Sequence, residues 1–330
     1  MNILQNMIQI LMKEMEKESA GEKKLKFFRL IQEAIKKAKN QKINILLVGG
    51  TGVGKSSTIN ALFGRYEAEV GVGQNPETTE IGNYNLENIT IWDSPGLGDS
   101  SENDRRYADQ IKTLLQRKNE NNEFIIDMVL VIVDGSSRQL ESTYKLIKEV
   151  LVPNITKERI VIGINKIDKA VGKYWDNINY CPKSEIKEFI ENKLKKPIKE
   201  RIKKDTGIEF SIICYSAGEI DIMTNTQDPG YNMAELLANI INATPVKKRI
   251  GYTDRVNEDS KVFESNDNTN DSEKSILKGI WETIAEIGGE ILEVVGDALF
   301  DIGKEVLKSA GKKVEGFLLK GAKFIKGLFS

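Results

Sequence analysis

The chain has no histidine, and it has two cysteines and seven prolines among its 330 residues. Without histidine it cannot carry a Ser-His-Asp triad, a histidine general base or a histidine-ligated zinc site. The two cysteines, Cys181 and Cys214, fit neither a disulfide framework nor paired metal-ligand spacing, and we interpret both as reduced thiols. These absences exclude the histidine-based catalytic classes and the small disulfide-rich secreted domains.

An excess of charge and long apolar runs are also missing. The formal net charge is -1, so a global electrostatic attraction to nucleic acid is absent, and we expect no nucleic-acid partner. No stretch approaches the roughly 20 uninterrupted apolar residues of a bilayer span. The first residues, MNILQNMIQILMKEMEKE, lack the basic region that opens a signal peptide. We therefore expect a soluble cytoplasmic protein.

The pattern of the chain changes at several points. Residues 1–40 carry apolar residues at helical spacing and predict an N-terminal helical segment. Over 41–250, short apolar runs alternate with amphipathic stretches, which predicts an α/β domain with a mostly parallel sheet and helices on both faces. Residues 251–275 are polar and acidic and predict a flexible linker, and 276–330 predict a C-terminal amphipathic helical tail. The expected strands are 43–48, 88–92, 127–133, 159–164 and 210–214, and the expected helices include 55–63, 102–117, 138–150 and 183–204.

The first expected strand ends in the glycine-rich sequence GGTGVGKSS, residues 49–57, which matches GxxxxGK[ST] between a strand and a helix. The backbone N–H groups of such a loop surround the α- and β-phosphates, and the following helix points its N-terminus at them. Lys55 is expected to reach the β- and γ-phosphates and Ser56 to ligate Mg²⁺. The alternative is a glycine-rich turn that ends by chance in Lys-Ser. The nucleotide-binding residues predicted here are Gly50, Thr51, Gly52, Val53, Gly54, Lys55, Ser56 and Ser57.

Two further stretches predict contacts to Mg²⁺ and the γ-phosphate. Asp93, after the apolar run NITIW, can hold Mg²⁺ through water, and the Gly96 N–H can contact a γ-phosphate. Thr78 and Thr79 are each able to close a loop over Mg²⁺ when the γ-phosphate is present. The predicted metal ligands are Ser56, Asp93 and one of Thr78 and Thr79, and the predicted catalytic residues are Lys55, Thr79 and Gly96.

The last two strand ends predict a guanine site. Asn165, Lys166 and Asp168 follow the run RIVIGI, and the Asp168 carboxylate can accept two hydrogen bonds from guanine that adenine cannot offer. Asn165 can tie this loop to the phosphate loop, and Lys166 can lay its aliphatic stem on the base. Ser216 and Ala217 follow the next run, where a backbone N–H can reach guanine O6. This order of motifs predicts GTP and GDP as ligands with Mg²⁺ as cofactor, and disfavours an ATPase.

These motifs resemble those of the Era-like and septin-like GTPases of the translation-factor class. The longer stretches TGVGKSSTINALFG, EVGVGQNPET, TIWDSPGLGDS, VLVIVDGSSR, INKIDKA and CYSAG resemble the YfjP-like bacterial GTPases. The resemblance covers about residues 43–250, and it does not explain either end of the chain. It implies the P-loop GTPase fold and hydrolysis of GTP to GDP and phosphate.

The chain departs from its relatives at three positions. Leu97 stands where Ras-type enzymes place a water-orienting glutamine, and an apolar side chain cannot orient the attacking water. Gly52 stands where some Era relatives have an asparagine that holds potassium, and Gly218 stands where many have lysine. We therefore expect slow hydrolysis that a partner or dimerisation stimulates. Candidates for a stimulatory arginine are Arg105, Arg106 and Arg138, although a solvated surface position is the better interpretation of each.

The tail begins with an apolar stripe at helical spacing, Leu277, Ile280, Ile284 and onward, and from Glu282 to Asp301 all of the charged residues beside it are acidic. Beyond Lys304 lysines dominate, which predicts an antiparallel helical hairpin whose faces attract. We expect it to dock on the chain's own N-terminal helix and GTPase domain. The alternatives are that the tail lies on the inner face of an anionic membrane or that it binds an unknown protein partner. The predicted function is a GTP-dependent switch; the alternative is a non-hydrolysing interaction or membrane-associating module.

Overall fold

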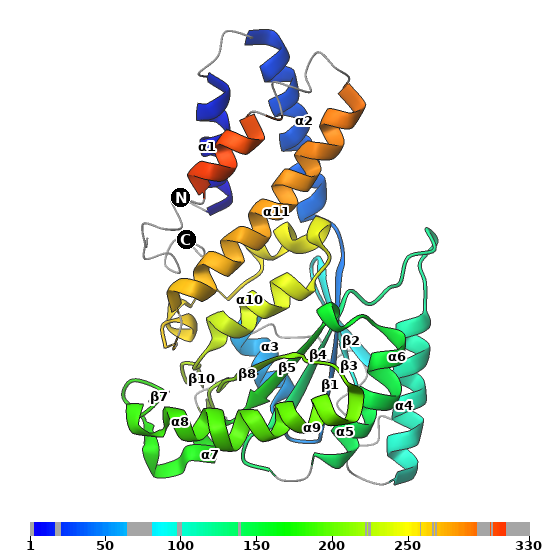
Figure 1. The fold of residues 1–330 in the computed structure, drawn as a ribbon, viewed down its shortest axis with the longest axis vertical. Coiled ribbons are helices and arrows are strands. Elements are labelled where there is room, and N and C mark those ends of the chain that lie inside the picture. Colours follow the sequence, from blue (N-terminus) through cyan, green and yellow to red (C-terminus); the bar gives the residue numbers. More distant parts are fainter. Residues whose placement is uncertain are drawn as a thin grey trace.

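The computed structural model is built around a six-stranded sheet in the order β2-β3-β1-β4-β5-β8 (Figure 1). Neighbouring strands pair in parallel, except that β2 pairs antiparallel with β3, so the predicted mostly parallel sheet is confirmed. The strands are β1 (Ile43–Gly49), β2 (Gly82–Leu86), β3 (Ile89–Asp93), β4 (Met128–Asp134), β5 (Ile160–Asn165) and β8 (Ser211–Cys214). The structure describes residues 3–16, 21–64, 81–97, 101–137, 140–221, 223, 226–257, 259–265, 267, 269–295, 304 and 306–314.

Strand β1 shows why the sheet lies between two helical layers. Its residues 45–48 are all fully buried, without the polar alternation of a half-exposed strand. Ile45 and Leu47 belong to one core cluster, and Leu46 and Val48 belong to the other. A continuous apolar strand of this kind is typical of a parallel sheet that helices cover on both faces.

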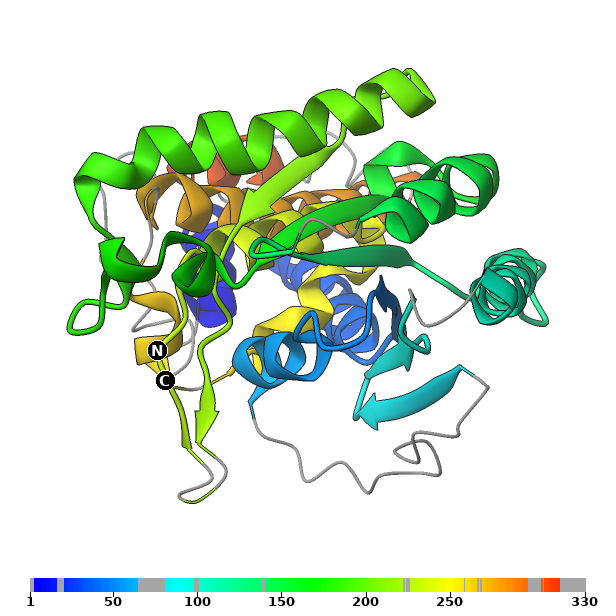
Figure 2. The same cartoon turned by 90° about the horizontal axis from the view of Figure 1, so that it is seen from below.

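Helices cover both faces of the sheet (Figure 2). Helices α3 and α10 pack in the first core cluster, and α4, α5 and α9 pack in the second. The four helices expected from the sequence are present, although the third begins at Glu141 and includes a π-helical turn. The helices of this domain are α3 (Lys55–Phe63), α4 (Ser101–Gln116), α5 (Glu141–Leu146), α6 (Val152–Asn154), α7 (Ile167–Val171), α8 (Lys187–Phe189), α9 (Lys196–Thr206) and α10 (Met233–Ala243), with π-helical turns at Ile147–Leu151 and Ile190–Lys195.

Two short hairpins follow the loops at the ends of β5 and β8. The first pairs β6 (Trp175–Asp176) with β7 (Cys181–Pro182), and the second pairs β9 (Ile220–Asp221) with β10 (Thr226–Gln227). Both therefore extend from the edge of the sheet where the parallel strands end (Figure 2). Among the described residues, this edge carries the predicted phosphate, Asp93 and guanine motifs.

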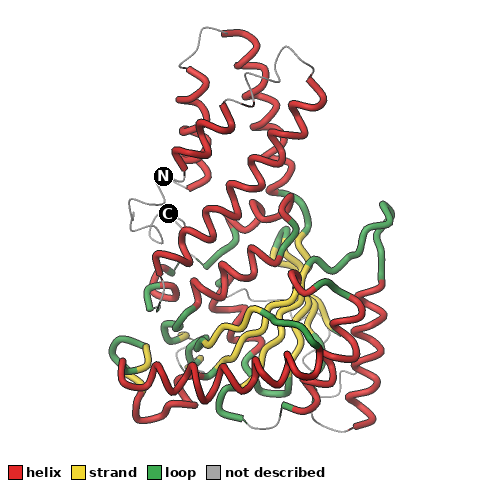
Figure 3. Tube along the Cα trace, in the orientation of Figure 1, coloured by secondary structure: helices red, strands yellow, loops and turns green. Residues whose placement is uncertain are grey.

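The first and the last described helices of the chain meet in one helical layer, which Figure 3 shows at one end of the described structure. Helix α11 (Thr269–Val295) packs on α10, on α2 (Gly21–Lys39) and on the 3₁₀ segment Val246–Asp254, and α1 (Ile3–Glu16) packs on α2. The helical residues 306–314 run antiparallel to α11, with Leu307 against Gly288 and Gly311 against Trp281. The described part of the tail therefore docks on the chain's own helices. No helix within the described ranges is long and apolar enough to span a bilayer.

The prediction of a flexible linker over 251–275 is wrong for the residues that the structure describes. The 3₁₀ segments Val246–Asp254 and Ser260–Phe263 pack on the domain, and Tyr252 and Phe263 are each 1% exposed. Both side chains belong to the first core cluster. A few apolar anchors inside a polar stretch are enough to fix it, and an average over the composition hides them.

Candidate functional site

The glycine-rich loop after β1 lies against the segment that follows β3. The Leu97 N–H donates to the Gly49 carbonyl at 3.2 Å, and the Thr51 N–H donates to the Leu97 carbonyl at 3.4 Å. The approach is so close that a Cβ on Gly96 would lie 2.1 Å from the Thr51 hydroxyl oxygen. Only glycine allows the two loops to meet here. The structure therefore brings the first two predicted motifs together at one edge of the sheet.

Lys55 begins helix α3 and turns its ammonium back over the loop. Its Nζ lies 3.4 Å from the carbonyl oxygens of both Gly49 and Gly50. Ser56 follows on the exposed side of the first turn of α3. The first turn of a helix presents backbone N–H groups without helical partners, so this geometry can receive the phosphates of a nucleotide.

Asp93 ends β3 beside the glycine-rich loop. Burial raises the pKa of its carboxyl above the usual value, against the opposing charge of Lys55 and a hydrogen bond from the Tyr84 hydroxyl. Among the described residues, no hydrogen-bond partner meets the buried Oδ1 atom of Asp93 or the buried Ser94 hydroxyl. Buried oxygens without a partner are rare in proteins, and Asp93 Oδ1 is an acceptor of the kind that Mg²⁺ and its waters prefer.

The residues present therefore fit a magnesium site made of Asp93 and Ser56 together with phosphate oxygens, because Mg²⁺ is usually held by one or two protein oxygens plus the phosphates of its nucleotide. The remaining predicted ligands, Thr78 and Thr79, lie outside the described residues.

Asn165 joins three of the predicted motifs. Its Nδ2 donates to the Val53 carbonyl at 2.9 Å, and its Oδ1 accepts from the Ala217 N–H at 3.1 Å. Its side chain is almost fully buried, at 2% exposure. The tie between the Asn165 loop and the phosphate loop that the sequence predicts is therefore present, and the Ser216–Ala217 loop joins it.

The Asp168 carboxylate lies beside Ser216, whose hydroxyl donates to Asp168 Oδ1 at 2.6 Å. Lys166 pairs with Asp134, which ends the neighbouring strand β4, at 2.7 Å. Partial burial alone would raise the pKa of Asp134, but hydrogen bonds from Lys166 and Ser136 hold it below its usual value. The sequence motifs do not single out Asp134, although an acidic residue at the end of a strand was an available signal.

Gln227 on the second hairpin also escaped the sequence analysis. Its Nε2 donates to the Ala217 carbonyl at 2.7 Å and to the Ser57 carbonyl at 2.9 Å. It thus links the Ser216–Ala217 loop to helix α3. No motif marks such a residue, because its role depends on a hairpin that folds back over the loop.

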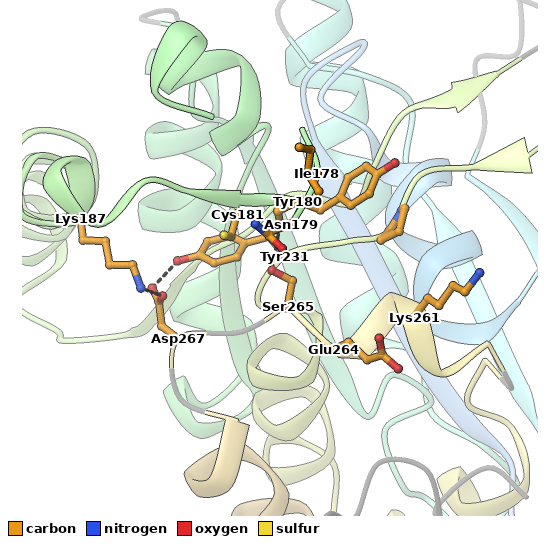
Figure 4. Close-up of a pocket in the computed structure, with 11 residues that line it drawn as sticks. Ile178, Asn179, Tyr180, Cys181, Lys187, Tyr231, Lys261, Glu264, Ser265 and Asp267 are labelled. Carbon is orange, nitrogen blue, oxygen red and sulfur yellow. Dashed lines mark hydrogen bonds and ion pairs between the residues drawn. The ribbon is translucent and has the colours of Figure 1, made fainter. Parts of the chain in front are cut away.

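Tyr231 connects the same loop to the segment before α11. Its backbone pairs with Ser216 on one side and with Ser265 on the other. Its hydroxyl donates to the Asp267 carboxylate, which also pairs with Lys187 at 2.5 Å (Figure 4). Tyr231, Asp267, Lys187 and Ser265 line a cavity of about 520 Å³ together with residues of the first hairpin.

Leu97, which the sequence places where a water-orienting glutamine would stand, and the three candidate arginines take different positions. Leu97 is buried in the second core cluster at 6% exposure. Arg105 and Arg106 are exposed on α4, and the Arg106 guanidinium lies over the Tyr107 ring. Arg138 lies outside the described residues. The geometry therefore gives neither described arginine a place against the glycine-rich loop.

Comparison with known proteins agrees with this geometry. Residues 44–166 match the family described as "50S ribosome-binding GTPase". GTPase Der of Campylobacter curvus is 24% identical over 280 residues, which cover 82% of this chain and 55% of that protein. Interferon-gamma-inducible GTPase 10 of Mus musculus is 33% identical over 93 residues, 26% of this chain and 22% of that protein.

A solved structure described as a "probable GTP-binding protein engB" aligns with a TM-score of 0.37 and 20% identity, over 61% of this chain and 97% of that one. The chain spans about half the length, or less, of the curated relatives it matches. Since residues 44–166 match the family and hold the glycine-rich loop, the Asp93 strand and the start of the guanine motif, this chain contains a P-loop GTPase domain.

Proposed function

We propose that this protein binds GTP and GDP with Mg²⁺ and hydrolyses GTP to GDP and phosphate as a slow molecular switch. The observation that carries the proposal is Asn165, which ties the phosphate loop, its own Asn-Lys-x-Asp loop and the Ser216–Ala217 loop together. One buried side chain thereby links the predicted phosphate and base sites. The matched family and the names of the relatives support the same activity.

Each part of the site has a task in this proposal. Lys55 and the backbone of residues 50–56 bind the phosphates and stabilise the charge that develops on the γ-phosphate. Asp93 and Ser56 would hold Mg²⁺, which would neutralise part of the negative charge of the phosphates. Asp168 reads guanine, and Thr78 or Thr79 completes the metal site in the GTP-bound state.

Slow turnover follows from Leu97. Its side chain is buried and apolar, and its backbone is committed to the glycine-rich loop on both sides. No water-orienting group is therefore available from this position, and we propose that a partner or a second copy supplies the missing stimulation. The resemblance to YfjP-like GTPases, a GTPase domain over 41–250 and a cytoplasmic location are parts of the same proposal.

The direct test compares the unchanged chain with two variants. Lys55→Ala is expected to abolish phosphate release from GTP and to weaken GDP binding, because it removes the charge nearest the phosphates. Asp168→Asn is expected to shift the preference from guanine to xanthine nucleotides, because an amide matches the xanthine edge. Binding is measured with fluorescent nucleotides and hydrolysis by phosphate release. Full GTP selectivity in the Asp168→Asn variant would show that Asp168 does not read the base.

The buried Leu97 also favours a second candidate, a module that binds GTP without hydrolysing it and uses it to stabilise an interaction. Single-turnover hydrolysis at a series of protein concentrations separates the two. A measurable rate at every concentration supports the switch, and a rate that rises with concentration supports stimulation by a second copy. No phosphate release over many hours supports the non-hydrolysing module.

A further inference from the structure

Tyr84 lies on the edge strand β2 and shares a face of the sheet with Asp93. In the antiparallel pairing of β2 with β3, Tyr84 stands opposite Ile91, and Gly82 stands opposite Asp93. Tyr84 and Asp93 are therefore diagonal neighbours on one face, at a separation that a long aromatic side chain can bridge. Ile91 belongs to the first core cluster, and Tyr84 packs against this cluster. Both therefore lie on the face of the sheet that helix α3 covers.

The position directly across from Asp93 is open. Gly82 has no side chain, and no atom lies within 4 Å of the place where its Cβ would be. The nearest side chain that β2 offers to the carboxyl is therefore the diagonal Tyr84. This arrangement gives Tyr84 access to Asp93 without competition from residue 82.

The diagonal register brings the Tyr84 hydroxyl within reach of the Asp93 carboxyl. Burial and this interaction raise the pKa of Tyr84, and the interaction opposes the rise in the pKa of Asp93 that burial causes. The Oδ1 atom of Asp93 is buried and has no hydrogen-bond partner in the described part of the chain. One side of the carboxylate is thus held by a neutral donor, and one oxygen stays available to Mg²⁺ or to one of its waters. A carboxylate fixed in this way cannot rotate freely about its last bond.

We propose that Tyr84 is a positioning residue for the magnesium site and that its hydroxyl fixes the Asp93 carboxylate so that the unbonded oxygen faces the metal. The inference rests on the proposed binding of GDP and GTP with Mg²⁺. A packing role alone would need only the aromatic ring, which phenylalanine keeps. The substitution Tyr84→Phe therefore separates positioning from packing.

The experiment measures GDP affinity of Tyr84→Phe across a magnesium titration and in excess chelator. Loss of a hydrogen bond that orients a metal ligand typically lowers metal affinity by roughly 10- to 100-fold. Because Asp93 is expected to act through water, we expect about a 10-fold rise in the Mg²⁺ concentration needed for tight GDP binding. GDP affinity in chelator is expected to stay unchanged, because no phosphate or base contact is altered.

Tyr252→Phe is the matched control. The Tyr252 hydroxyl is also buried and pairs with the Thr244 hydroxyl at 2.8 Å, on the segment beneath α11. Its loss is expected to lower stability without changing the Mg²⁺ requirement. A Tyr84→Phe variant with an unchanged Mg²⁺ requirement, or one that weakens GDP equally with and without the metal, overturns the inference alone. Absence of GDP binding by the unchanged protein overturns the proposed function and this inference with it.

Discussion

At the scale of single residues, Gly218 explains one departure from the relatives that this chain resembles. Its backbone has φ +80°, and a Cβ there would lie 2.1 Å from the Asp228 carbonyl oxygen. That carbonyl belongs to the chain that returns from the second hairpin, where the Asp228 N–H donates to the Glu219 carbonyl. The returning chain fills the space that a lysine would need. The glycine is therefore a consequence of the hairpin and gives no reason to doubt the guanine site.

Restoring the relatives' residue is expected to harm the protein. Gly218→Lys should lower the free energy of unfolding by about 1–3 kcal/mol, because a side chain at positive φ is strained and the Cβ meets backbone. It should also weaken GDP binding, since the strain lies next to Ala217. Denaturant unfolding and nucleotide titration measure the two effects.

Gly172→Lys provides the control, because Gly172 has φ +52° but no atom within 4 Å of its Cβ position. It should carry the backbone strain without the collision. If Gly218→Lys binds GDP as tightly as the unchanged chain, the loop can move, and the explanation offered for the departure fails.

At the scale of elements, the apolar pattern of the sequence predicts the central strands of the sheet but does not predict the edge strand or the hairpin contacts. Residues 45–48 and 160–164 of two predicted strand runs are buried on both faces, so composition alone marks them. Strand β2, with the sequence GNYNL, is short, polar and at the edge, and its pairing with β3 is what makes it a strand. Contacts such as those of Gln227 depend on chain returns that no local pattern encodes.

The segment 259–267 is the clearest case of such a return. Tyr231 pairs with Ser265 through the backbone and with Asp267 through its hydroxyl, and the Asp267 N–H donates to Asn232 Oδ1 at 2.9 Å (Figure 4). The Lys187–Asp267 pair is partly exposed, so by itself it contributes less than about 1 kcal/mol to the free energy of unfolding. The Tyr231 contacts are therefore expected to hold the segment.

We expect Tyr231→Phe to lower the free energy of unfolding by about 1–2 kcal/mol, because it removes the hydroxyl that donates to Asp267 Oδ2 and leaves the carboxylate only its partly exposed pair with Lys187. Hydrogen exchange at residues 265 and 267 should become faster. Tyr180→Phe is the control, since Tyr180 lines the same cavity and no hydrogen bond of its hydroxyl is found within the described residues (Figure 4). Equal exchange in both variants would mean that the Tyr231 hydroxyl does not fasten the segment.

At the scale of the whole molecule, the described N-terminal and C-terminal helices contact each other and the domain that carries the sheet. The sequence suggested that the acidic half of the tail attracts its basic half. The structure pairs the acids of α11 elsewhere, Glu282 with Arg249 at 2.5 Å and Glu290 with Lys247, both partners lying before the tail. The charge pattern of the tail does not predict these ion pairs, because Arg249 and Lys247 lie outside the tail. The packing of the apolar stripe of α11 in the first core cluster brings them beside its acidic residues.

Glu14 forms the contact between the first and last described helices. It is 7% exposed, and its carboxylate accepts from the Ser309 hydroxyl at 2.5 Å and pairs with Lys313. Glu14→Gln removes the charge and keeps the shape, so it should weaken both contacts. We expect a loss of about 1–3 kcal/mol in the free energy of unfolding, the range for hydrogen bonds to charged groups.

The location of that loss is as informative as its size. Because Glu14 touches the tail and lies outside the sheet, its loss should speed proteolysis within 306–314 while GDP affinity stays constant. Glu33→Gln, an exposed glutamate on α2, is the control and should change neither property. Proteolysis of the tail at the rate of the unchanged chain would show that the apolar stripe alone holds the ends together. A changed GDP affinity in Glu14→Gln would instead show that the helical layer is coupled to the nucleotide site.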